Sequence, residues 1–195
     1  ELFKGMQLAS MSMTLQAGEI ITNTFSTTGL GATVSTSRAS GATDVAAPTY
    51  PVLNAGSNVG SLLENGAAVT ASYMTELGFE LNNNLAGQRA IGSLPNVGIR
   101  NGELALGGTL RAYFNDIALL NKVLNDTETS IMFKTGQSSD NRNAYVWDIP
   151  RVKLTGTSEI GGKNTDRMFD GRYDALRHAT LGYTVGLTRF NYLPA

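Results

Sequence analysis

Cysteine is absent from this chain of 195 residues, and its absence removes several kinds of chemistry. Without cysteine there can be no disulfide, no thiolate metal site and no cysteine nucleophile. No run of 18 apolar residues occurs, so the sequence predicts no transmembrane helix and no insertion into a membrane. The start, Glu1 to Lys4, is not a signal peptide and lacks an initiator methionine, so we expect a mature or truncated product.

Charged side chains are scarce, at 16% of the sequence against roughly 25% in an average globular chain. The formal net charge is −1. Residues 1–99 carry three basic and six acidic groups, a balance of −3, whereas residues 100–195 carry twelve and ten, a balance of +2. A free-standing nucleic-acid-binding protein normally has a basic excess, and this sequence has none.

Period-two alternation, the pattern of half-buried strands, dominates what is present. Apolar residues alternate with Ser and Thr over 9–15, and a turn then leads into a returning strand over 20–25, which predicts a hairpin. A long strand is predicted over 104–114, with a bulge or bend at Gly107 and Gly108. The 22 glycines favour many turns between short strands.

A further strand is predicted over 75–81, where the two faces differ in chemistry. The apolar face carries Leu77, Phe79 and Leu81. The opposite face carries Glu76, Gly78 and Glu80, because successive side chains of a strand point to opposite sides.

One short helix is predicted over 116–124, capped by Asn115 or Asp116. Its expected apolar side is made of Ile117, Leu120, Val123 and Leu124.

Pro150 interrupts a strand over 144–154, which suits an edge or a bulge better than a central strand. The predicted fold class is mainly β, an antiparallel β-sandwich or barrel with one flanking α-helix and a long loop, in a single domain over 1–195.

The predicted long loop covers residues 33–68 and is rich in Gly, Ala, Ser, Thr and Asn. Its charges are widely spaced, and Tyr50 lies between two prolines. A segment of this length is either disordered or a functional loop. The residues singled out in it are Arg38, Asp44, Tyr50 and Glu64.

The sequence does not assemble a catalytic site. His178 is the single histidine and follows Asp174 by four residues, but no G-x-S-x-G motif accompanies it, and we interpret it as an exposed loop histidine. The segment Gly161 to Asn164 lacks the glycine spacing and the hydroxyl of a phosphate-binding loop and predicts a turn. We therefore expect no enzyme activity, no cofactor and no metal site.

Several segments in the second half have an order that resembles the tail-tube (major tail) proteins of long-tailed, non-contractile bacteriophages, the siphophages. The earlier segments 6–25, 29–32 and 77–82 fit the same pattern. The later segments are Tyr113 to Leu119, Thr127 to Ser130, Asn143 to Leu154, Gly161 to Asp166 and Tyr173 to Leu176.

This resemblance implies a structural virion protein with a β-sandwich and a flanking helix. It also implies that family members often begin with a further N-terminal segment, which we expect this sequence to lack. Six copies would form a ring, and rings would stack into a tube through which the genome leaves the capsid. Implied partners are tape-measure and tail-terminator or tip proteins, and DNA in transient non-specific passage. The implied location is the phage tail in the virion, and the host cytoplasm during assembly. Glu76 and Glu80 are then candidate lumen-facing acids, because a basic wall would hold DNA back. The loop over 33–68 is a candidate contact to a neighbouring ring.

Two other functions remain open from the sequence. A carbohydrate- or receptor-binding β-sandwich module would use Tyr50, Tyr145 and Trp147 as stacking aromatics. An esterase or metallohydrolase would depend on His178.

Overall fold

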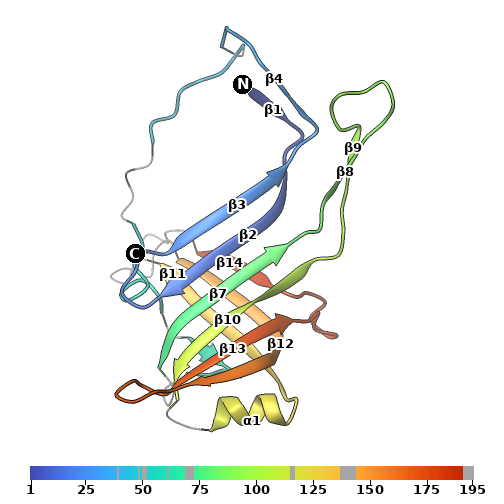
Figure 1. The fold of residues 1–195 in the computed structure, drawn as a ribbon. Helices are drawn as coiled ribbons and strands as arrows, with labels where there is room; N and C mark the ends of the chain where they lie inside the picture. The colour runs from blue at the N-terminus through green and yellow to red at the C-terminus, as the bar shows by residue number, and fades with distance from the viewer. Residues whose placement is uncertain are drawn as a thin grey trace. The chain divides into compact units, whose positions relative to one another are not determined.

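The computed structural model describes residues 1–38, 40–47, 49, 52–60, 62–68, 73–114, 117–136 and 144–190, with the backbone alone over 156–160. It confirms the predicted fold class, because antiparallel strands dominate and one short helix accompanies them (Figure 1). No helix among these residues is long and apolar enough to span a membrane.

Ten strands of the described residues form one sheet. They are β2 (Gln7–Gln16), β3 (Thr22–Thr28), β5 (Leu63–Glu64), β6 (Ala67–Ala68), β7 (Met74–Asn82), β10 (Ala105–Tyr113), β11 (Glu128–Gly136), β12 (Ala144–Ile160), β13 (Met168–Ala175) and β14 (Gly186–Phe190). The order in the sheet is β3-β2-β7-β10-β13-β12-β11-β5-β6, and β14 also pairs with β12. The predicted hairpin at the start of the chain is therefore confirmed as β2 and β3.

The chain divides into two compact units. Unit 1 contains Glu1–Met11, Thr24–Pro51 and Leu81–Ala105, and unit 2 contains Ser12–Asn23, Val52–Glu80 and Leu106–Ala195. The prediction of one domain over 1–195 stays a prediction, and each unit is described separately below.

Unit 2 holds the hydrophobic core. The alternation predicted for β7 is confirmed, since Leu77 and Phe79 are buried while Glu80 is exposed. Trp147 of β12 lies beside Phe79 with ring centroids 5.1 Å apart and stacks on Phe133 of β11 at 6.1 Å. The largest fully buried side chains are Tyr173, Phe79, Phe133, Leu110, Ile131, Ile149 and Val152. These side chains come from β7, β10, β11, β12 and β13, so one core joins the strands of this unit.

Pro150 lies within β12 at a place where the strand needs no N–H from it. Opposite β11, Thr129 pairs with Val152 and Ile131 with Ile149, so two residues of β12 face one residue of β11. This irregularity is the bulge that the sequence predicts for Pro150. On its other edge β12 pairs with β14 through Asp148 and with β13 from Val152 onward. A proline is therefore tolerated inside a strand that is paired on both sides.

Two glycines bring β7 and β10 close together. A Cβ atom added to Gly108 would lie 2.0 Å from the carbonyl oxygen of Gly78 and 2.8 Å from the Tyr173 hydroxyl. The Tyr173 hydroxyl donates a hydrogen bond of 2.7 Å to the same Gly78 oxygen. Of the bulge or bend predicted at Gly107–Gly108, the bulge is wrong for the pairing with β13, whose register runs without a shift from Gly107 to Tyr113. The glycines are needed for close approach instead.

The helix α1 (Ala118–Leu124) is shorter than predicted. Its N-cap is Ile117, and the predicted caps Asn115 and Asp116 lie outside the described residues. The buried residue is Leu119, whereas Ile117 and Leu124 are exposed, so the apolar face predicted from the spacing is partly wrong. A helix of two turns is marginal by itself, and α1 is held by its contact with β12.

Unit 1 is built from two-stranded ribbons in addition to the ends of longer strands (Figure 1). Here β1 (Leu2–Lys4) pairs with β4 (Gly31–Thr33), and β8 (Ala86–Gln88) pairs with β9 (Gly98–Arg100). Asn96, between β8 and β9, donates its backbone N–H to Leu30 and its side-chain amide to Gly29, both at 2.9 Å. Short ribbons of this kind are marginally stable by themselves in water.

Candidate assembly surfaces

Unit 1 exposes ten of its large apolar side chains to solvent, whereas Leu30, Leu81, Leu85, Ile99 and Leu104 are half-buried. Among its described residues Met11 is the single buried one, at 8% exposure. The exposed apolar side chains of this unit are Leu2, Phe3, Met6, Leu8, Phe25, Val34, Val45, Ile91, Leu94 and Val97. Extended apolar exposure on a soluble protein marks an interaction surface. The surface of unit 1 therefore has the chemistry of a region that another chain covers.

The strand β3 is an edge strand of the sheet among the described residues. It stands at one end of the sheet order and, among the described residues, pairs with β2 on one side. Its residues are exposed from Thr22 to Thr27 on both faces, and Phe25 is 59% exposed. A long exposed edge strand offers unpaired N–H and C=O groups to a strand of another copy.

The two predicted lumen acids lie on the polar face of β7. The Glu76 carboxylate is 3.8 Å from a guanidinium nitrogen of Arg111 on β10, and Arg111 also pairs with Asp170 of β13 at 2.9 Å. Glu80 is exposed on the same face of β7.

Burial, with a smaller contribution from the Glu80 charge, raises the pKa of Tyr173 far above its usual range. The Tyr173 hydroxyl therefore stays protonated and keeps donating to Gly78.

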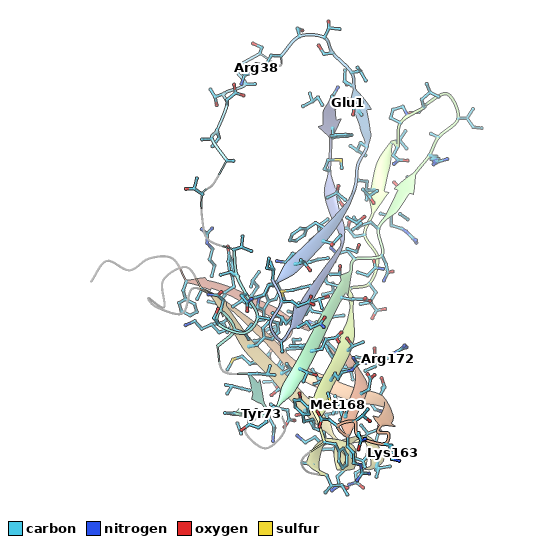
Figure 2. All side chains as sticks on the ribbon, turned by 60° about the vertical axis from the view of Figure 1, so that its left-hand side comes forward. Glu1, Arg38, Tyr73, Lys163, Met168 and Arg172 are labelled. Carbon is cyan, nitrogen blue, oxygen red and sulfur yellow. The ribbon has the colours of Figure 1, made fainter. Side chains whose placement is uncertain are left out.

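The residues singled out in the predicted loop separate in the structure. Arg38 and Asp44 form an exposed ion pair of 2.5 Å. Figure 2 shows Arg38 in the segment that follows β4. Glu64 instead lies in β5, which pairs with β6 and with β11 in unit 2. Tyr50 lies outside the described residues. The described part of residues 33–68 therefore includes two short strands near its end.

Glu64 belongs to a polar cluster that joins the helix to the sheet. Lys122 of α1 and Thr129 of β11 both donate to the Glu64 carboxylate. The Lys122 and Glu64 side chains are 21% and 17% exposed, so each depends on the other for its charge to be compensated. This cluster fixes β5 and α1 against β11.

Replacing Lys122 with Ala should destabilise the protein, because the carboxylate of Glu64 then stays nearly buried without its cation. We expect a loss of about 1–3 kcal/mol in the free energy of unfolding, measured by chemical denaturation. Lys153→Ala is the matched control, since its partner Asp126 is 71% exposed, and it should cost no more than about 0.5 kcal/mol. Equal losses in the two variants would contradict a special role for the Glu64 cluster.

The surroundings of His178 and Trp147 do not support the enzyme and glycan-binding alternatives. His178 Nδ1 accepts hydrogen bonds from the backbone N–H groups of Thr180 and Leu181, so the ring closes a turn. Trp147, a predicted stacking aromatic, is 8% exposed and packed in the core, and it is therefore not available to a sugar. The described residues contain no group of three or more His, Asp or Glu side chains that could hold a metal.

The turn predicted at Gly161 to Asn164 is confirmed between β12 and β13. Thr165 donates its backbone N–H to Gly162 at 3.3 Å, and Asn164 adopts φ +63°. Figure 2 shows Lys163 at this turn, with Met168 and Arg172 following on β13.

The exposed apolar character of unit 1 escaped the sequence interpretation. Ile91 and Leu94, for example, lie in a stretch of Gly, Asn and Ser without strand or helix periodicity. Isolated apolar residues in such a stretch, which no period places in a core, were the available signal.

Comparison with known proteins agrees with the resemblance seen in the segment order. No curated protein matches the sequence. The model of one family, described as phage tail tube protein, matches residues 1–185. This match covers nearly the whole chain, both units included. The chain therefore belongs to the phage tail tube protein family.

Proposed function

We propose that this protein is the tube subunit of a siphophage tail and that six copies form a ring. Rings stack into the tube through which the genome is delivered. The subunit has no catalytic role, assembles in the host cytoplasm, and meets tape-measure and tail-terminator or tip proteins in the virion. The observation that carries this proposal is the apolar surface of unit 1, where Met11 is the single buried residue of the described part.

The energetic argument follows from that surface. Each large apolar side chain left in water forgoes about 1.5–3 kcal/mol of stabilisation. Phe3, Phe25, Ile91 and Leu94 are all at least 58% exposed. Contact with other copies supplies the missing cover, and β3 supplies an edge on which the backbone of a neighbour can pair.

The lumen is proposed to be lined by the polar face that carries Glu76 and Glu80. Pairing in the register of β10 and β13 places Arg111 opposite Asp170, and residues paired in this way share a face. Together β7, β10 and β13 contribute four acids and two arginines to this face, a balance of −2. Its acids are Glu76, Glu80, Asp170 and Asp174, and its arginines are Arg111 and Arg172. A negative wall repels phosphates, so DNA would pass without being held.

The segment over 33–68 is proposed to reach a neighbouring ring. Arg38 and Asp44 pair with each other on the surface, so this exposed ion pair adds little to the stability of the protomer. The segment between β4 and Pro48 is free of described strands, which leaves it available for contact with another copy. In this proposal Tyr50 adds an aromatic contact and Glu64 anchors the end of the segment.

Purified protein should form rings with six-fold symmetry and stacked tubes in electron micrographs. Phe25→Gln should raise the concentration needed for assembly about tenfold, because part of an aromatic side chain no longer becomes buried between copies. Leu124→Gln on α1 is the matched control, since Leu124 is 70% exposed but lies outside unit 1, and assembly should be unchanged. A compact monomer that persists at high concentration would contradict the proposal.

A further inference from the structure

Unit 2 contains an apolar cavity of about 460 Å³ that no side chain described there fills. Most of its lining is aliphatic or aromatic, and Glu76 is the charged residue among the lining residues. The side chains that matter for the argument are Leu15, Val59, Leu62, Met74, Leu77 and Phe133. An apolar cavity of about 150 Å³ is enough to hold a benzene molecule. This cavity therefore has room for two branched aliphatic side chains.

Unit 1 contains two side chains that suit such a cavity. Ile91 and Leu94, between β8 and β9, are 108% and 103% exposed, as exposed as in a free peptide. Burying either one fully would gain about 1.5–3 kcal/mol.

The backbone holds this tip in a defined shape. Ser93 donates its N–H to Ala90 and its hydroxyl to Pro95, at 3.2 and 2.9 Å. Gly92 adopts φ +84°, a conformation that favours glycine, and so allows the turn. The two apolar side chains are thus presented at the tip of a hydrogen-bonded turn.

Charge also favours this pairing. Residues 83–102 contain Arg89 and Arg100 and no acid, which gives the hairpin a balance of +2. Glu76 lines the cavity, and together with Arg111 at 3.8 Å and Asp170, which pairs with Arg111 at 2.9 Å, it forms a group with a balance of −1. Opposite charges around an apolar contact steer the encounter and select the correct partner.

We propose that the β8–β9 hairpin of one copy inserts Ile91 and Leu94 into the cavity of unit 2 of a second copy. This inference rests on the proposed self-assembly and names one of its contacts. The inserting surface and the receiving surface differ, so the contact is heterologous and joins copies head to tail. A head-to-tail contact either closes a ring or extends an open polymer, and both are needed for a tube.

The absence of cysteine allows a direct test between copies. Chains carrying Leu94→Cys are mixed with chains carrying Leu62→Cys, assembled, and treated with a short thiol-reactive cross-linker. Each chain has one thiol, so a covalent pair of the two different chains can form only between copies. We expect this pair to be the main product, identified by mass spectrometry of the linked peptides. Leu94→Cys mixed with Leu181→Cys is the control, since Leu181 is 52% exposed and does not line the cavity.

Electron micrographs of the same samples separate the possible failures. Tubes without the Leu94–Leu62 product would overturn this contact and leave the assembly proposal standing, with another occupant for the cavity. A chain carrying both cysteines that links within the monomer would overturn it as well, because the hairpin would then fill its own cavity. If the unmodified protein forms no assemblies at all, both proposals fall.

A second variant tests the energetics without a cross-linker. Ile91→Ser combined with Leu94→Ser should leave thermal unfolding unchanged, because both side chains are already exposed. The concentration needed for assembly should rise at least about tenfold. Assembly at the original concentration would overturn the proposal.

Discussion

Replacing Gly108 with Ala is expected to destabilise the protein by about 3 kcal/mol or more. The added methyl group would lie 2.0 Å from the Gly78 carbonyl oxygen, which belongs to the backbone of β7 and cannot rotate away. The same group would lie 2.8 Å from the Tyr173 hydroxyl, the donor to that oxygen. Relief therefore requires β7 and β10 to separate, which breaks the hydrogen bond and opens the core.

Thermal unfolding measures this effect, with an expected fall in Tm of about 6–12 °C. Gly161→Ala is the matched control, because the new Cβ would meet only the Arg167 side chain, at 3.4 Å, and the φ of Gly161 is not positive. That variant should change the free energy of unfolding by about 0.5 kcal/mol or less. If both variants unfold at the temperature of the parent protein, the close approach of β7 and β10 is incorrect.

The second large effect concerns hydrogen exchange in the unassembled subunit. Amide protons of β1, β4, β8 and β9 should exchange rapidly, because these short ribbons have few buried contacts to resist local opening. Those of β11, β12 and β13 should exchange slowly, since their strands carry the core of unit 2.

Assembly should slow exchange in the unit 1 ribbons by about 100-fold or more, which corresponds to about 3 kcal/mol of added local stability. The strands of unit 2 serve as the internal control and should change much less. Strong protection of β8 and β9 in the isolated subunit would contradict the idea that copies stabilise unit 1. Mass spectrometry of peptides from the two states provides the measurement.

The alternation of apolar and polar residues was sufficient to predict β7 and β2, two strands that contribute buried side chains to the core. The alternation around Leu77 and Phe79 predicted β7 and its buried face, and the same rule predicted β2. A single side chain also gave useful information at Pro150, whose missing N–H required a bulge or an edge, and the structure has the bulge.

Contacts between distant residues could not be predicted in this way. Nothing local to Gly108 indicates that the Gly78 backbone lies against it, because the approach is set by the pairing of two strands 30 positions apart. Glu64 was grouped with Arg38 because both lie in a polar, glycine-rich stretch, whereas its partners are Lys122 and Thr129, far along the chain. The assignment of Glu76 and Glu80 to a lumen stays a prediction.

The fluorescence of Trp147 reports on the core of unit 2 and not on unit 1. Trp147 is the sole tryptophan, and its ring neighbours Phe79 and Phe133 both belong to unit 2. Emission from this indole follows the opening of that core. A sample whose amino-terminal ribbon has frayed, or been clipped by a protease, would therefore give the spectrum of intact protein while having lost part of the surface that we propose for contacts between subunits.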